Sequence, residues 1–239
     1  SWSSGRAQGT KTSKGSESTG VIPFVKVVDS EMLAFSQGVT RRGSYAAYLH
    51  MSHPEIAEFL DMRKPTGGDT NRKCLNLHHG VVIPDKFMEI IHKATKEPGF
   101  DDSWELIDPH SGEVKNVVSA RTLWVKLLQN RMETGEPYIM FEDAVNADLP
   151  DFQKEKGLRV HHSNLCSEIT LATNDERTAV CCLSSVNLEY YDEWKKVPAF
   201  IPDLIRMLDN VLESFIQNAP PQLERAKFSA LRERSLGLG

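Results

Sequence analysis

The chain has 239 residues, 40% of them hydrophobic, which is enough apolar material for one sizeable core. Its formal net charge of −5 provides no broad basic surface, which argues against a protein that mainly grips nucleic acid. The sequence has no apolar run of about eighteen residues and no signal-peptide layout at its start, so we expect a soluble cytoplasmic protein.

The cysteines and histidines do not have the spacing of a metal site. Cysteines 74, 166, 181 and 182 match neither a secreted disulfide framework nor a Cys-x-x-Cys zinc pattern. The pairs His78–His79 and His161–His162 lack the i, i+4 spacing of a helical zinc site. We therefore expect free or redox-active thiols in a reducing compartment and no bound metal.

The first half of the chain predicts strands that alternate with helices. Residues 1–23 are rich in Ser, Gly, Lys and Thr, and they predict a mobile loop region. An apolar stripe predicts a helix over 24–37, ended by Gly38. The elements expected next are a strand at 44–51, a helix at 54–63 capped by Ser52, a turn-rich loop at 65–73, a strand at 75–83 and a helix at 85–96.

The second half continues the alternation. A hairpin is expected at 104–107 and 113–118, followed by a helix at 119–133 and a strand at 138–141. The polar stretch at 142–159 is expected to be irregular, although residues 143–148 could form a turn of helix. An apolar, β-prone run covers 179–188, and helices are expected at 200–217 and 223–232, before a short apolar segment at 235–239. Strands that alternate with helices indicate an α/β architecture with mainly parallel pairing.

Residues 161–171, His-His-Ser-Asn-Leu-Cys-Ser-Glu-Ile-Thr-Leu, place Asn164, Cys166 and Glu168 at alternate positions. In an extended segment these three side chains share one face, where a thiol, a carboxylate and an amide would form a reaction centre. The simpler alternative is a small buried thiol beside a solvated strand face. A second strand carrying Cys181 or Cys182 could bring another thiol close to Cys166.

The motif Asn-Leu-Cys-Ser-Glu-Ile, followed by Cys-x-Leu-x-Ser-x-Asn-Leu, resembles the large (alpha) subunit of class I ribonucleotide reductase. Further matches are Ser-Thr-Gly-Val-Ile-Pro-Phe (18–24), Ser-Gln-Gly-Val-Thr-Arg-Arg-Gly (36–43), His-Pro-Glu-Ile (53–56), Glu-Thr-Gly-Glu-Pro-Tyr-Ile (133–139) and Arg-Ser-Leu-Gly-Leu-Gly (234–239). They occur in the family's order and cover nearly the whole chain, whereas the chain covers only part of the family's protein.

The resemblance implies part of a ten-stranded α/β barrel: most of the first half-barrel, the central loop with the reactive Cys and the strand that follows it. On this interpretation residues 1–23 are a Gly/Ser-rich loop region, and 24–239 are a barrel domain truncated at both ends. The chain would then be a fragment or a split gene product, inactive by itself.

The same resemblance implies roles for individual residues. Cys166 would carry the thiyl radical, Glu168 would act as general base, and Asn164 would hold the sugar hydroxyls. Cys181 would be one of two thiols that close to a redox-active disulfide, its partner lying before Ser1. Ser163, Asn164 and Arg72 would bind substrate. Cys182 and Cys74 are interpreted as core packing.

Two loops resemble the segments through which the family senses dNTP and ATP effectors. The implied effector-binding residues are Gln37, Arg41, Arg42, Asn71 and Lys73. Without the resemblance, a solvated basic turn is the simpler interpretation.

The implied partners are a small (beta) subunit whose dinuclear metal centre supplies the radical, complementary large-subunit segments, a thioredoxin or glutaredoxin, and a second copy bound through helices 24–37 and 53–63. No cofactor would bind the chain directly, and neither a membrane nor a nucleic-acid polymer is expected as a partner.

The implied function is that of an oxidoreductase, the catalytic core of a ribonucleoside-diphosphate reductase that makes deoxyribonucleotides for DNA replication. One alternative is an inactive module that binds nucleotide or docks on a complementary chain. Another is a thiol hydrolase with Cys166 as nucleophile and His161 or His162 as base, although no His is fixed beside the thiol.

Overall fold

The computed structural model describes residues 1–37 and 40–239, which form two compact units. Unit 1 contains residues 1–156 and 160–170, and unit 2 contains residues 157–159 and 171–239. Gly38, predicted to end the first helix, lies outside the described residues. In the described part of the chain, no helix is long and apolar enough to cross a membrane.

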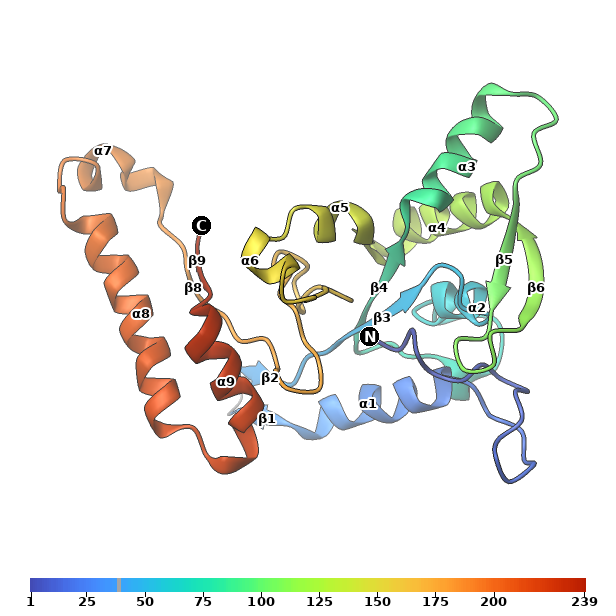
Figure 1. Cartoon of the computed structure of the whole chain (residues 1–239), viewed down its shortest axis with the longest axis horizontal. Coiled ribbons are helices and arrows are strands. Elements are labelled where there is room, and N and C mark those ends of the chain that lie inside the picture. The colour runs from blue at the N-terminus through green and yellow to red at the C-terminus, as the bar shows by residue number, and fades with distance from the viewer. Residues whose placement is uncertain (38–39) are drawn as a thin grey trace. The chain divides into compact units, whose positions relative to one another are not determined.

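A parallel three-stranded sheet lies at the centre of unit 1 (Figure 1). Its strands are β3 (Ala46–His50), β4 (His78–Ile83) and β7 (Tyr138–Phe141), in the order β3-β4-β7. In the register of these strands, Tyr48, Gly80 and Tyr138 form one row across the sheet. Parallel pairing between strands separated by helices confirms the α/β class, and the sheet is open, as expected for part of a barrel.

The two faces of this sheet contact different clusters. On one face Ala47, Leu49, Val81 and Ile83 join the large core of unit 1, together with residues of four helices. These helices are α1 (Ile22–Ala34), α2 (Ile56–Asp61), α3 (Asp85–Lys96) and α4 (Ala120–Thr134). On the other face Tyr48, Val82 and Met140 pack with Leu149 and Val160 in a smaller cluster. Side chains alternate across a strand, so this second face is the one that meets the segment leading to Cys166.

The smaller elements of unit 1 connect these parts. The predicted hairpin is confirmed as antiparallel β5 (Ser103–Ile107) and β6 (Val114–Ser119). The region expected to be irregular contains α5 (Glu142–Ala147) and α6 (Asp151–Lys154). The remaining elements are β1 (Ser36–Gln37), β2 (Arg41–Arg42) and the 3₁₀ turn η1 (Thr70–Arg72).

The helix ends and caps predicted from the sequence agree with the structure at some helices and differ at others. The predicted bounds of α3 are confirmed, and Ser119 caps α4 by accepting a hydrogen bond from the Thr122 amide at 3.0 Å. The predicted cap of α2 at Ser52 is wrong, because α2 begins after Glu55. The Ser52 hydroxyl instead bonds Nδ1 of His50 at 2.6 Å.

The N-terminal segment has no long element, as expected, but it is anchored rather than mobile. The Asp108 carboxylate accepts hydrogen bonds from the Ala7 amide at 2.7 Å and the Thr10 hydroxyl at 2.8 Å. All three residues are buried. The proposed boundary at residue 23 stays a prediction, and α1 begins just before it, at Ile22.

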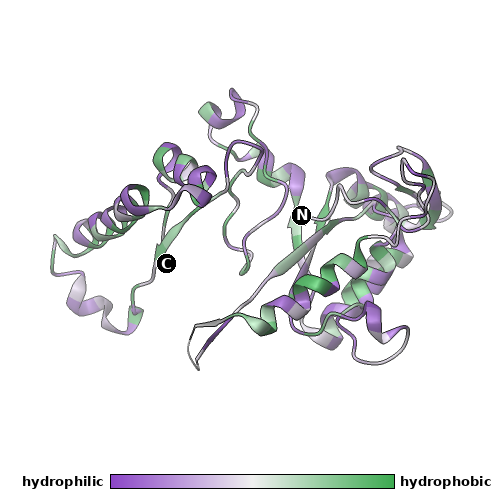
Figure 2. Cartoon of the chain, turned by 90° about the horizontal axis from the view of Figure 1, so that it is seen from below, coloured by the Kyte–Doolittle hydropathy of each residue, from purple (hydrophilic) through white to green (hydrophobic). Residues whose placement is uncertain are grey.

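Unit 2 is a small helical layer on two short parallel strands. Helices α8 (Phe200–Asn218) and α9 (Glu224–Glu233) pack with β8 (Cys182–Ser184) and β9 (Leu236–Leu238). Its remaining elements are η2 (Leu188–Tyr190), α7 (Tyr191–Trp194) and η3 (Pro221–Leu223). Figure 2 shows both hydrophobic and hydrophilic residues along α8, whose buried residues are Leu208, Leu212 and Ile216. The strand expected over 179–188 is confirmed only in its centre, because β8 covers only Cys182–Ser184.

Candidate active site

The segment that carries Cys166 starts from the second face of the sheet. Val160 is fully buried in the cluster with Tyr48, Val82 and Met140. The side chain of Asn146, in α5, holds the Val160 backbone from both sides: Oδ1 accepts from the amide at 2.8 Å, and Nδ2 donates to the carbonyl at 3.0 Å. The entry to the loop is thus fixed to the sheet.

The segment is a tight turn, so the prediction of an extended segment is wrong. The Ser167 amide donates to the Asn164 carbonyl at 3.3 Å, and the Asn164 amide donates to the Ile169 carbonyl at 3.1 Å. The Asn164 side chain closes the same loop, because its Oδ1 accepts from the Ile169 amide at 3.1 Å. Asn and Ser side chains offer the backbone such local bonds in place of a strand ladder.

The turn gives the three alternating side chains different surroundings. Cys166, at the third position of the turn, is exposed, and Glu168 is exposed as well. Asn164 uses its oxygen inside the loop, which leaves its Nδ2 group as the part able to donate to a ligand hydroxyl. The thiol, the carboxylate and the amide therefore share one turn but not the flat strand face that we expected.

Ser163, expected to bind substrate, is buried directly before the turn. Its hydroxyl lies 2.7 Å from the Ile169 carbonyl, to which it donates. In this arrangement Ser163 supports the loop, and its contact with substrate stays a prediction.

Two aromatic side chains support the loop: Tyr48, which the sequence motif did not indicate, and His162, which was considered only as a base. The Tyr48 hydroxyl donates to the Asn164 carbonyl at 3.3 Å, and the Tyr48 ring stacks on His162 at 5.9 Å between centroids. His162 donates from Nδ1 to the Ser163 carbonyl at 3.0 Å, and burial lowers its pKa. A neutral His162 stacked and bonded in this way is a support of the loop, which weakens its candidacy as a base for Cys166.

A charged cluster lies beside Tyr138. His78 stacks on the Tyr138 ring with 6.1 Å between centroids, and both His78 and His79 bond the Glu136 carboxylate through Nδ1. Burial alone would raise the pKa of Glu136, but the two histidine bonds and the Arg63 charge lower it to about 2. Burial raises the pKa of Tyr138, and the nearby charges of Glu136, Cys166 and Glu168 add to this rise.

The other cysteines have distinct surroundings. Cys74 is fully buried, and burial raises its pKa to about 12, which confirms its interpretation as core packing. Cys182 packs against the core of unit 2, as predicted. Cys181 is half-buried, with its thiol 3.7 Å from the Cys182 carbonyl. Cys181 belongs to unit 2 and Cys166 to unit 1, and their meeting stays a prediction.

The predicted nucleotide-binding residues lie on two loops of unit 1. Arg72 pairs with Glu55 at 3.1 Å and with Glu58, while Lys73 donates to the Asp61 carbonyl at 3.0 Å. The Asn71 amide donates to Asp69 at 2.9 Å. These contacts shape the loop, and its binding of substrate or effector stays a prediction.

The other loop is the hairpin of β1 and β2. Arg41 and Arg42 are exposed on β2, opposite Gln37 and Ser36 of β1. Only the backbone of Gln37 is described; its side chain lies outside the described structure. Effector binding by these residues also stays a prediction.

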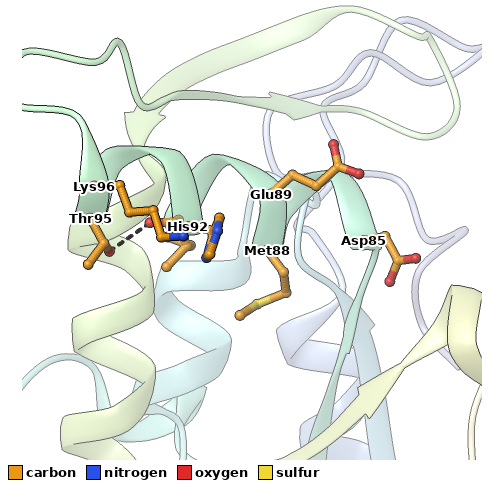
Figure 3. Close-up of a pocket in the computed structure, with 7 residues that line it drawn as sticks. Asp85, Met88, Glu89, His92, Thr95 and Lys96 are labelled. Atoms are coloured by element: carbon orange, nitrogen blue, oxygen red, sulfur yellow. Dashed lines mark hydrogen bonds between the residues drawn. The ribbon is translucent and has the colours of Figure 1, made fainter.

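A groove of about 570 Å³ lies elsewhere on the surface, along helix α3. Figure 3 shows Asp85, Met88, Glu89, His92, Thr95 and Lys96 along one side of this helix. The Thr95 hydroxyl donates to the Ile91 carbonyl of its own helix at 2.8 Å. The groove contains none of the predicted site residues.

Among residues 1–37 and 40–239, no group of three His, Cys, Asp or Glu side chains is placed to hold a metal ion.

Comparison with known proteins identifies the family. The sequence profile described as "Ribonucleotide reductase, barrel domain" matches residues 1–239. The chain belongs to the ribonucleotide reductase barrel-domain family. That the Cys166 turn is the reactive-cysteine loop of this family stays a prediction.

Individual relatives of this ribonucleotide reductase chain support the assignment. It is 52% identical to a putative ribonucleoside-diphosphate reductase large subunit of Frog virus 3, over 93% of this chain and 38% of that protein. It is 34% identical to the reductase alpha subunit of Chlamydia pneumoniae, over 100% of this chain and 24% of that protein.

The similarity extends to a solved structure, the class Id ribonucleotide reductase alpha subunit of Actinobacillus ureae. The TM-score is 0.71 with 36% identity, over 93% of this chain and 37% of that one. The chain thus spans roughly two fifths or less of these relatives, as expected of a partial barrel.

Proposed function

We propose that this chain is the cysteine-loop portion of the catalytic barrel of a ribonucleoside-diphosphate reductase large subunit. The observation that carries the proposal is the Cys166 turn: an exposed thiol, flanked by Asn164 and Glu168, on a loop fixed to the face of a parallel sheet. The family match over the whole chain supports the same assignment.

The proposed reaction replaces the 2′-hydroxyl of a ribonucleotide with hydrogen. A thiyl radical on Cys166 abstracts the 3′ hydrogen atom, Glu168 takes the proton of the 3′-hydroxyl, and the Nδ2 group of Asn164 donates to a sugar hydroxyl. The 2′-hydroxyl leaves as water, and at the end Glu168 returns the proton to the 3′ oxygen while Cys166 returns its hydrogen atom to C3′, which restores the thiyl radical. Cys181 and a thiol outside this chain supply two electrons and two hydrogens by closing to a disulfide, which balances the reaction.

The partners in this proposal follow from the chemistry. Cys166 needs a radical, which a small subunit with a dinuclear metal centre would deliver, and the disulfide needs a thioredoxin or glutaredoxin to reopen it. Ser163 and Arg72 would help to bind substrate, and the loops that carry Gln37, Arg41, Arg42, Asn71 and Lys73 would sense dNTP or ATP effectors. The compartment consistent with reduced thiols is the cytoplasm.

A second copy of the chain is proposed to bind mainly through α1. This helix exposes Phe24, Val27 and Leu33, each more than half exposed. In α2, by contrast, Ile56, Phe59 and Leu60 are buried in the core of unit 1. These exposed apolar side chains support α1 as the main part of the proposed dimer surface, and the share of the helix expected at 53–63 stays a prediction.

The test is ribonucleoside-diphosphate reduction after this chain is mixed with the missing large-subunit segments, a small subunit and a thioredoxin. Cys166→Ser and Cys181→Ser are expected to abolish turnover, because each removes a reacting thiol. Cys182→Ser is the matched control, since its side chain packs in the core of unit 2, and it should retain turnover. Equal turnover in the wild-type and Cys166→Ser proteins would favour a binding remnant instead.

A further inference from the structure

Tyr48 is the middle residue of β3 and lies on the sheet face that contacts the segment leading to the cysteine loop. It is 1% exposed and lies between Ala47 and Leu49 in β3. Its ring lies over Gly80 of the neighbouring strand, where an added Cβ would come within 2.4 Å of the ring. Glycine at position 80 thus makes room for the ring, since any larger side chain would displace it.

The Tyr48 side chain contacts the loop on both sides of the thiol. Before Cys166, its hydroxyl donates to the Asn164 carbonyl at 3.3 Å, and its ring stacks on His162. After Cys166, the Ser167 side chain lies near enough to oppose, as the Ser163 side chain also does, the rise in the pKa of Tyr48 that burial causes. A single side chain therefore joins the two ends of the turn.

The turn needs such support because its backbone is strained. Ser167, directly after Cys166, has a φ of 71°, in the left-handed region that residues other than glycine rarely occupy. Such a conformation costs on the order of 1–3 kcal/mol and persists only where surrounding contacts impose it. The Asn164 carbonyl accepts hydrogen bonds from both the Ser167 amide, at 3.3 Å, and the Tyr48 hydroxyl. Tyr48 therefore binds the acceptor of the hydrogen bond that closes the turn.

We propose that Tyr48 is a positioning residue, which fixes the Cys166 thiol where it can abstract hydrogen from the substrate. This inference rests on the proposed reductase function. Hydrogen abstraction requires close approach of the reacting atoms, and a misplacement of about 1 Å can cost roughly hundredfold in rate. Tyr48 touches the loop and not the substrate, so its loss lowers kcat while KM stays nearly constant.

The experiment compares Tyr48→Phe with Tyr45→Phe in the full large subunit assayed with its small subunit. Tyr45 is the matched control, because its half-buried side chain packs against the large core rather than the loop. Tyr48→Phe keeps the ring and removes only the hydroxyl. We expect it to lower kcat by about tenfold or more with KM within about twofold, while Tyr45→Phe changes neither by more than about twofold.

A second readout needs no turnover. The rate at which iodoacetamide alkylates Cys166, followed by mass spectrometry of the peptide, is expected to change by about threefold or more in Tyr48→Phe and to stay unchanged in Tyr45→Phe. Gly80→Ala, which pushes the Tyr48 ring away, is expected to shift both readouts in the same direction as Tyr48→Phe.

The outcomes separate the two proposals. If wild-type and Tyr48→Phe proteins have equal kcat and equal alkylation rates while Cys166→Ser is inactive, the positioning role is wrong and the reductase function stands. If Tyr45→Phe loses as much as Tyr48→Phe, the effect is general instability and the positioning role is also wrong. If the wild-type protein has no turnover, the reductase function fails, and the alkylation rates still decide the role of Tyr48.

Discussion

The buried Glu136 carboxylate provides a quantitative test of the electrostatics beside the cysteine loop. Its side chain is 10% exposed and contacts His78, His79 and Arg63. We consider Glu136→Gln, which keeps the shape of the side chain and removes its charge. The Gln side chain can still form hydrogen bonds with its neighbours, so the substitution mainly removes the electrostatic attraction of the carboxylate to these partners.

The magnitude follows from the pKa of Glu136, which is lowered from 4.5 to about 2 in the folded chain. A fall of this size corresponds to about 3 kcal/mol of folding free energy at pH 7. Because the folded pKa lies below the unfolded one, this stabilisation is fully present above pH 4.5 and is lost as the pH falls towards 2. At pH 3 about 1.4 kcal/mol remains.

The assay is hydrogen exchange of the β4 amides, including the His79 amide, which donates to Glu136 at 3.2 Å. Glu136→Gln is expected to lower protection by roughly hundredfold or more at pH 7 and by only about tenfold at pH 3. The matched control is Glu133→Gln: this side chain is 58% exposed and pairs with Lys64 at 2.9 Å, so it should change stability by less than about 1 kcal/mol. Equal losses in the two variants, or a loss independent of pH, would refute the reasoning.

Two further predictions concern a buried thiol and a helix cap. Native Cys74 should resist iodoacetamide at pH 8 while Cys166 reacts, because Cys74 is fully buried and its pKa is raised to about 12; equal labelling of the two thiols by mass spectrometry would contradict this. Ser119→Ala should destabilise unit 1 by about 1 kcal/mol in urea unfolding, since it removes the cap of α4 and a 2.6 Å bond to Asp102; an unchanged midpoint would count against the cap.

Elements with signals at both ends were predictable from the sequence. Helix α3 has Pro84 directly before it and an apolar period of 3.6, and its expected bounds are confirmed. The strand β7 was likewise confirmed at 138–141. In these segments the local signals and the periodicity favour the same structure.

The reactive loop was not predictable in the same way. Alternation around Cys166 indicated a strand, but bonds from Ser163 and Asn164 to the backbone of Ile169 turn the chain back on itself. Such local bonds compete with strand pairing, and periodicity does not register them. The family resemblance placed Cys166 on a loop, but the spacing of the motif did not reveal the turn.

The supports of the loop were missed for a different reason. Tyr48, Gly80 and Tyr138 come from three strands, and only the register of the sheet places them in one row. A single sequence predicts each strand but not which residues of neighbouring strands lie opposite one another. The close approach of Gly80 to the Tyr48 ring is the one local trace of this arrangement, because a glycine inside a strand often marks a close contact.

The Asp108 anchor has a consequence for protein engineering. Beyond the bonds to Ala7 and Thr10, the chain forms a narrow loop closed by the Lys11–Glu17 bridge, and its residues 13–17 are exposed. The anchor holds the base of this loop, and the tip carries no buried contact. A fluorophore or an affinity tag inserted between Lys14 and Gly15 would therefore be expected to leave the sheet and the cysteine loop undisturbed.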